Sequence, residues 1–103
     1  DAPRTAVLAD MLELGDEAVT YHCNIGKRIA ELGIERLLAV GELSKHISDL
    51  SNSQTRHYKD VAALIADSPA FGANETVLIK GSRAMQLDRF VDAMCESLGG
   101  TSC

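Results

Sequence analysis

Short, largely apolar runs alternate along the chain with segments in which apolar side chains recur every three or four residues. The runs occupy residues 5–9, 36–40 and 76–79, and each is followed by a charged residue or a glycine. Runs of this length and composition are typical of strands that are buried on both faces of a parallel sheet. The sequence therefore predicts three such strands, together with a very short strand at His57 and Tyr58.

The segments between the strands have the spacing of helices that pack along one side. Gly33 follows the first of these segments, where a glycine commonly ends a helix. Strands that alternate with helices imply right-handed crossovers, so we predict an α/β fold with a mainly parallel sheet and helices on both faces. The predicted helical faces are Ala18, His22, Ile25, Ile29 and Leu32; Leu43, Ile47 and Leu50; Val61, Leu64 and Ile65; and Leu87, Phe90, Val91, Met94 and Leu98.

Length and composition indicate one domain of 103 residues, with residues 99–103 as a frayed tail. The formal net charge of -5 and the scattered basic residues argue against nucleic acid or an anionic membrane as a partner. The apolar runs are far shorter than the roughly 20 residues that span a bilayer, and the chain starts without a signal-peptide pattern. Three cysteines without Cys-x-x-Cys spacing predict no metal site, and we expect reduced thiols and a cytoplasmic protein.

The candidate chemistry lies at the carboxyl ends of the predicted strands, which share one edge of a parallel sheet. Lys80 and Arg83 would bring positive charge to this edge, opposite the carboxylates of Asp10, Glu13 and Glu42. A mixture of this kind suits a zwitterionic ligand, or phosphate together with Mg²⁺.

Each of these residues also has a purely structural interpretation. Asp10 and Glu13 are equally well explained as solvated loop acids near a helix N-terminus. Ser82 fits the N-cap of the last helix better than a nucleophile, and Arg83 would then lie one residue into that helix. His22 lies on an apolar stripe, which favours a core histidine over a ligand.

Several blocks of residues, in their order and spacing, resemble one protein family. They are residues 8–15, His22, residues 33–41, and the Lys80, Gly81, Ser82 and Arg83 block with Met85. Together they resemble the C-terminal domain of the Mur ligases, and within that family the branch that adds D-alanyl-D-alanine. The resemblance extends over roughly residues 5–98, and the last block separates this branch from its sister ligases.

This resemblance implies a Rossmann-like domain of an ATP-dependent ligase of peptidoglycan synthesis. The family joins D-alanyl-D-alanine to UDP-N-acetylmuramoyl-tripeptide through an acyl phosphate, using ATP and Mg²⁺ bound mainly by a central domain. Lys80, Gly81, Ser82 and Arg83 would face the dipeptide, with Arg83 on its carboxylate. By the same resemblance, the loop at the interface with the central domain, on its nucleotide side, holds Asp10, Met11, Glu13 and Gly15. No residue of this chain would be catalytic.

Departures from the family pattern limit what the chain is expected to do alone. Ala9 stands where the family usually has glycine, and no phosphate-binding loop or carbamylated-lysine region is present. The family's N-terminal and central domains and the opening strand-helix unit of its C-terminal domain are also lacking, so we expect an inactive and poorly stable fragment with an open sheet edge.

Two other interpretations stay open. One is a noncatalytic flavodoxin-like or receiver-like domain with Asp10 as its acceptor or metal-binding acid; Lys80 fits it, but an adjacent acidic pair is lacking. The other is an interaction domain with a vestigial site.

Overall fold

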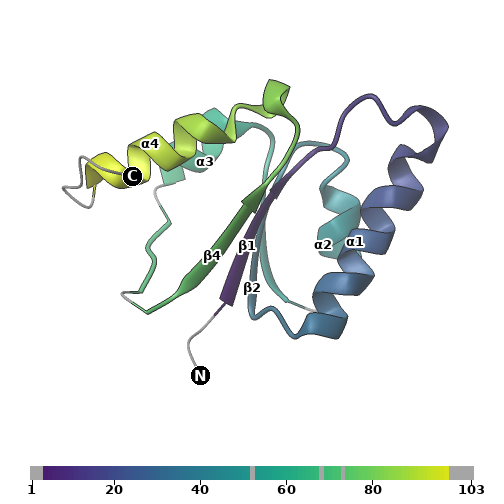
Figure 1. The fold of residues 1–103 in the computed structure, drawn as a ribbon, viewed down its shortest axis with the longest axis horizontal. Coiled ribbons are helices and arrows are strands. Elements are labelled where there is room, and N and C mark those ends of the chain that lie inside the picture. Colours follow the sequence, from purple (N-terminus) through teal and green to yellow (C-terminus); the bar gives the residue numbers. More distant parts are fainter. Residues whose placement is uncertain (1–3, 52, 68, 73, 98–103) are drawn as a thin grey trace.

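A computed structural model describes residues 4–51, 53–67, 69–72 and 74–97. Within these residues a parallel sheet lies between two pairs of helices, so the chain forms three layers (Figure 1). The elements are β1 (Arg4–Ala9), the 3₁₀ turn η1 (Gly15–Glu17), α1 (Ala18–Leu32), β2 (Arg36–Val40), α2 (Lys45–Leu50), β3 (Gln54–Tyr58), α3 (Val61–Asp67), β4 (Thr76–Lys80), the 3₁₀ turn η2 (Arg83–Met85) and α4 (Leu87–Ser97).

The strand order places a change of direction at the centre of the sheet. The four described strands follow the order β3-β2-β1-β4, and every neighbouring pair is parallel. The chain therefore moves outward from β1 to β3 and then crosses back to add β4 on the other side of β1. In open α/β sheets such a reversal leaves a crevice at the carboxyl ends of the two diverging strands. The predicted fold class is confirmed, and the predicted site lies at this reversal.

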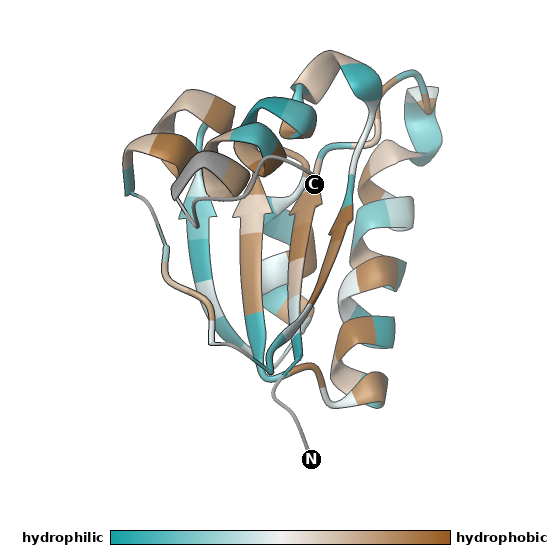
Figure 2. Ribbon diagram, turned by 60° about the vertical axis from the view of Figure 1, so that its left-hand side comes forward, coloured by the Kyte–Doolittle hydropathy of each residue, from teal (hydrophilic) through white to brown (hydrophobic). Residues whose placement is uncertain are grey.

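Alternating side chains of β1 supply both halves of the core. Val7 and Ala9 face α3 and α4 in one apolar cluster, whereas Ala6 and Leu8 face α1 and α2 in another. Figure 2 shows β1, β2 and β4 as largely hydrophobic, while β3 is largely hydrophilic. Strand β1 is therefore covered on both faces and paired on both edges.

The structure corrects three details of the sequence prediction. Strand β3 spans Gln54–Tyr58 rather than two residues, and four of its five residues are exposed, so it carries no apolar alternation to detect. Strand β4 is predicted to be buried on both faces, yet Leu78 is 53% exposed, because β4 lies at an edge of the described sheet and packs against a core cluster through Val77 and Ile79 on its other face. The last helix begins only at Leu87, after the η2 turn. The predicted tail at residues 99–103, and Leu98, lie outside the described residues.

The cysteine prediction holds in part. Cys23 is free, but Cys95 is disulfide-bonded, which contradicts the expectation of reduced thiols. An odd number of cysteines excludes a fully paired set and still allows one pair, and spacing along the sequence does not report which side chains meet in the fold.

Gly26 allows the closest helix contact in the structure's α1–α2 layer. A Cβ at this position would lie 2.5 Å from the backbone oxygen of Ile47 and 3.1 Å from the Cβ of Leu50. Helix α1 can therefore pack against α2 only with glycine at the crossing.

We predict that Gly26→Ala destabilises the protein although alanine is the better helix former. Replacement gains about 1 kcal/mol of helix propensity, but the backbone clash costs about 1–3 kcal/mol more than that gain, because two helices must separate. The matched control is Gly72→Ala, where the nearest atom would be 3.9 Å away. Urea denaturation of both variants measures the difference, and equal midpoints would contradict the packing role of Gly26.

Candidate functional site

The loops that follow β1 and β4 meet at the carboxyl edge of the sheet. We call residues 10–15 the β1 loop and residues 80–83 the β4 loop. The N–H of Ser82 donates to the carbonyl oxygen of Asp10 at 3.1 Å, and the Ser82 hydroxyl accepts the N–H of Leu12 at 2.7 Å. The predicted convergence of these two loops is confirmed, whereas the Ser82 side chain makes no helix-capping hydrogen bond.

Gly81 is required for this close approach. A Cβ on Gly81 would lie 2.6 Å from the Cβ of Ala9, which is closer than two non-bonded carbon atoms approach. Ala9 itself is 2% exposed and pairs with β2, so it has no room to yield. The alanine that departs from the family pattern therefore packs against the β4 loop and makes glycine necessary there.

The Asp10 carboxylate turns toward α2 and away from solvent. Asp10 is 6% exposed, and its Oδ1 accepts the N–H of Ser44 at 2.7 Å. Gly41, with φ of 105°, lies so close that a Cβ would be 2.5 Å from the carboxylate oxygens. A side chain held in this way links β1 to the start of α2 and is not a free anion at the edge.

His22 holds the β1 loop from its other side. The imidazole is fully buried; its Nε2 accepts the N–H of Met11 at 3.0 Å, and its Nδ1 lies 2.7 Å from the carbonyl oxygen of Ala18. An acceptor at Nε2 requires the neutral tautomer with the proton on Nδ1, which then donates to Ala18. His22 is therefore a core histidine, as predicted, that also fixes the backbone of a candidate site loop.

The other two predicted acids, Glu13 and Glu42, are exposed. Glu13 has a positive φ of 66°, as does the exposed Gly15, with φ of 58°. Glu42 is exposed in the turn before α2 and does not line the groove described next. The three predicted carboxylates therefore do not gather opposite the cations of the β4 loop.

A groove of about 690 Å³ runs between the end of β4 and the first turns of α4. It carries the cations Lys80 and Arg83, and the carboxylate of Asp88, which the sequence analysis missed. Arg83 is the first residue of the short 3₁₀ helix η2 and does not belong to the last helix α4, which corrects its predicted position. We call it the β4–α4 groove, and its lining residues are Ile79, Lys80, Gly81, Ser82, Arg83, Leu87, Asp88 and Val91.

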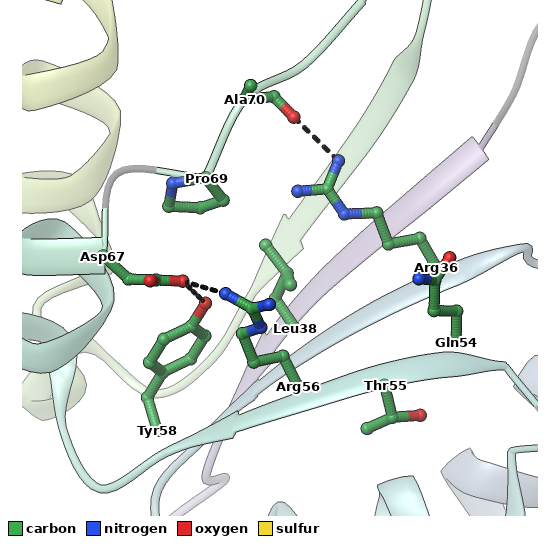
Figure 3. Close-up of a pocket in the computed structure, with 9 residues that line it drawn as sticks. All are labelled: Arg36, Leu38, Gln54, Thr55, Arg56, Tyr58, Asp67, Pro69 and Ala70. Atoms are coloured by element: carbon green, nitrogen blue, oxygen red, sulfur yellow. Dashed lines mark hydrogen bonds and ion pairs between the residues drawn. The ribbon is translucent and has the colours of Figure 1, made fainter.

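A second pocket, of about 440 Å³, lies at the opposite edge of the sheet (Figure 3). Three of its polar side chains are bonded to one another, and Arg36 donates to the carbonyl oxygen of Ala70. The carboxylate of Asp67 pairs with Arg56 at 2.8 Å and accepts the Tyr58 hydroxyl, which joins the end of α3 to β3. Burial raises the pKa of Tyr58, and the Tyr58 and Arg56 hydrogen bonds lower the pKa of Asp67. The charged groups of Arg56 and Asp67 in this pocket are therefore paired with each other and hold α3 against β3.

Glu75 closes the same edge next to this pocket. Its side chain is 8% exposed and accepts the Thr5 hydroxyl and the Gly72 N–H, with Arg36 3.5 Å away. Burial is the largest single influence on the pKa of Glu75 and would raise it. The bonds from Thr5 and Gly72 and the charge of Arg36 together outweigh burial, so the pKa is lowered.

Metal ligands do not gather within the described part of the chain. No group of three or more His, Cys, Asp or Glu side chains there could hold a metal ion. No described helix is long and apolar enough to cross a membrane.

The fold and the groove together define the class of this protein. It is a doubly wound α/β domain whose parallel sheet reverses direction beside a groove that carries both signs of charge.

Comparison with known proteins identifies the relatives of this domain. No protein-family model matches the chain. The chain is 36% identical over 97 residues to the UDP-N-acetylmuramoyl-tripeptide--D-alanyl-D-alanine ligase of Escherichia coli. The aligned region covers 91% of this chain and 21% of that ligase. The ligase of the same name from Rickettsia prowazekii is 34% identical, and the alignment covers 86% of this chain and 20% of that ligase. The ligase from Bacillus subtilis is 32% identical, with 88% of this chain and 21% of that ligase covered.

Solved structures agree on the fold. Two crystal structures of MurF from Acinetobacter baumannii superpose with TM-scores of 0.70 and 0.67, at 22% and 24% identity. They cover 91% and 87% of this chain and 22% and 21% of their own. The chain is therefore homologous to one domain of MurF, the D-alanyl-D-alanine-adding ligase of peptidoglycan synthesis, and spans about a fifth of the length of these relatives. The resemblance to the Mur ligases is confirmed.

The lowered pKa of Glu75 predicts acid sensitivity. A carboxylate whose pKa is lower in the folded state stabilises the fold above the ordinary glutamate pKa of about 4.3, and this contribution is lost as the pH falls through the folded-state value. We expect Glu75→Gln to lower the free energy of unfolding at pH 7 and to flatten its decline below about pH 4.3. Glu31→Gln, which removes a carboxylate that is 66% exposed, is the control. Parallel pH profiles for wild type and Glu75→Gln would contradict this assignment.

Proposed function

We propose that this chain is the C-terminal part of an ATP-dependent ligase that joins D-alanyl-D-alanine to UDP-N-acetylmuramoyl-tripeptide. The observation that carries the proposal is the 36% identity to the Escherichia coli ligase across 91% of the chain. The β4–α4 groove adds support, because its charges suit a small zwitterion of the kind that this ligase uses.

In this proposal the β4 loop binds the dipeptide. Arg83 is exposed at the groove, and its planar guanidinium can hold a carboxylate through two parallel hydrogen bonds. Lys80 adds a second positive charge at the end of β4. Gly81 and Ser82 line the groove between the two cations. The hydrogen bonds of Ser82 to the β1 loop fix the position of this segment relative to the sheet.

The β1 loop is proposed to face the central domain of the same ligase, on the nucleotide side. Of the four residues predicted at this interface, Met11 is partly exposed, Glu13 and Gly15 are exposed, and the buried Asp10 shapes the loop from within. Because Asp10 is held by Ser44, it positions the loop and is not offered as an acid-base catalyst or an acceptor. The same burial argues against the receiver-like interpretation.

The nucleotide chemistry is assigned to the rest of the ligase. ATP would convert the tripeptide carboxylate into an acyl phosphate, which the amine of the dipeptide attacks to release phosphate. The described residues do not provide a set of ligands for Mg²⁺, so this chain is proposed to present the amine while the central domain holds ATP and the metal ion. The N-terminal domain and the UDP-linked substrate complete the assembly, and we expect it in the cytoplasm.

The reaction itself provides the test. A complete polypeptide that contains this chain should release ADP and phosphate only when ATP, UDP-N-acetylmuramoyl-tripeptide and D-alanyl-D-alanine are all present, with the pentapeptide product identified by mass spectrometry. The chain alone should release none. A complete polypeptide that makes no product would refute the proposed function.

We predict that Arg83→Ala in the complete ligase raises the KM for D-alanyl-D-alanine about ten- to a hundredfold, since a charge-assisted hydrogen bond contributes about 1.5–3 kcal/mol. The KM for ATP should stay within about twofold, because Arg83 is not proposed to contact the nucleotide. Steady-state kinetics with each substrate varied in turn measures both constants.

Arg89→Ala is the matched control for Arg83→Ala. Arg89 is also exposed and cationic, but it bonds to the Gln86 side chain and lies outside the groove. Equal KM values for the dipeptide in the two variants would exclude Arg83 as its carboxylate partner.

A further inference from the structure

The β4–α4 groove holds a carboxylate beside its two cations. Asp88 lies in the first turn of α4 and lines the same groove as Lys80 and Arg83. Asp88 lies five residues after Arg83 in the sequence. In one continuous helix from Ser82, with about 3.6 residues per turn, these two side chains would not lie on the same face. In the structure the segment is not one continuous helix, and both residues line the groove.

Two turns of backbone separate the cations from Asp88. The η2 turn is closed by hydrogen bonds from the N–H of Met85 to Ser82 and from the N–H of Gln86 to Arg83. Gln86 then adopts φ of 58°, a left-handed conformation that reverses the chain before α4 begins. The start of α4 is tied to the turn, because the N–H of Arg89 donates to the carbonyl oxygen of Gln86 at 3.0 Å. Asp88 is therefore held at a set position relative to Arg83.

The three charged side chains of the groove are not paired within the described residues. No hydrogen bond or ion pair there engages the side chain of Lys80, Arg83 or Asp88, and all three residues are exposed. Opposite charges that line one groove without neutralising each other can each meet a group of a ligand. By contrast, the charges of the pocket in Figure 3 satisfy one another.

The remaining wall of the groove is apolar and suits small alkyl groups. Ile79, Leu87 and Val91 line it, and Leu87 is 8% exposed. A ligand that matches this lining carries a carboxylate, an ammonium group and small apolar side chains.

We propose that Asp88 binds the ammonium group of the incoming dipeptide, while Arg83 and Lys80 bind its carboxylate. This assignment rests on the proposed ligase function and adds to it the residue that recognises the amine end. An ammonium group donates up to three hydrogen bonds, and a carboxylate at the mouth of the groove accepts one or two of them. Asp88 thereby favours amines over uncharged isosteres and orients the nitrogen that will form the new bond.

The test compares Asp88→Asn with Asp92→Asn in the complete ligase. Asp92 is an exposed carboxylate on the same helix and lies outside the groove, so its replacement makes the same change of charge elsewhere. We expect Asp88→Asn to raise the KM for D-alanyl-D-alanine about tenfold or more, with little change in the KM for ATP. Asp92→Asn should leave both constants within about twofold of wild type, and Asp88→Glu should recover part of the loss.

A deaminated ligand separates recognition from folding. N-propionyl-D-alanine keeps the carboxylate and both methyl-bearing units but lacks the ammonium group, so it acts as a competitive inhibitor with nothing for Asp88 to hold. Its inhibition constant should be the same in wild type and Asp88→Asn. A general distortion of the groove, or loss of a favourable charge at the start of α4, would weaken the dipeptide and the inhibitor alike.

The outcomes distinguish the two proposals. If wild-type ligase makes product and Asp88→Asn leaves the KM for the dipeptide unchanged, or weakens the inhibitor as much as the dipeptide, the Asp88 assignment is overturned and the ligase function stands. If the wild-type polypeptide makes no product, the ligase function is refuted and the Asp88 assignment falls with it.

Discussion

The close contact between β4 and the carboxyl end of β1 is the constraint on which the candidate site depends. Gly81 lies against Ala9 without room for a side chain, and Ser82 bonds to the backbone of the β1 loop through both its N–H and its hydroxyl. Strand β1 pairs with β2 on its other edge and is buried on both faces. The cations Lys80 and Arg83 thus lie at a fixed place relative to a buried strand that is paired on both edges, although both residues are exposed.

The β1 loop is held by hydrogen bonds to α1 and to the start of α2. His22 of α1 accepts the Met11 N–H, and the Asp10 carboxylate accepts the Ser44 N–H at the start of α2. Both side chains are buried, so each bond is shielded from competing water and contributes more to positioning than an exposed bond would. A loop held at neighbouring residues in this way has a fixed backbone, while Glu13 is exposed.

The elements and the meeting of the loops could be predicted from the sequence, because apolar runs and helical stripes report burial and parallel strands share an edge. Gly33 ends α1 in the left-handed conformation that its position indicated. The direction of single side chains could not be predicted. Asp10 at a strand end suggested an exposed acid, and only the packing of Gly41 and Ser44 around it turns it inward. Asp88 was missed because a helix-start acid is common, and the left-handed Gln86 that brings it to the groove carries no sequence signal that favours this conformation.

The two edges of the sheet use charge in opposite ways. Beside β2 and β3, Arg56 pairs with Asp67 and Arg36 pairs with Glu75. These groups are committed to holding α3, β3 and the segment before β4. At the carboxyl ends, Lys80, Arg83 and Asp88 line one groove without such pairing in the described residues. Exposed unpaired charges contribute little to folding, so their shared position is better explained by a ligand with two opposite charges than by stability. This contrast supports the proposal that the dipeptide binds at the carboxyl ends of the strands, whereas the paired charges beside β2 and β3 hold the fold together.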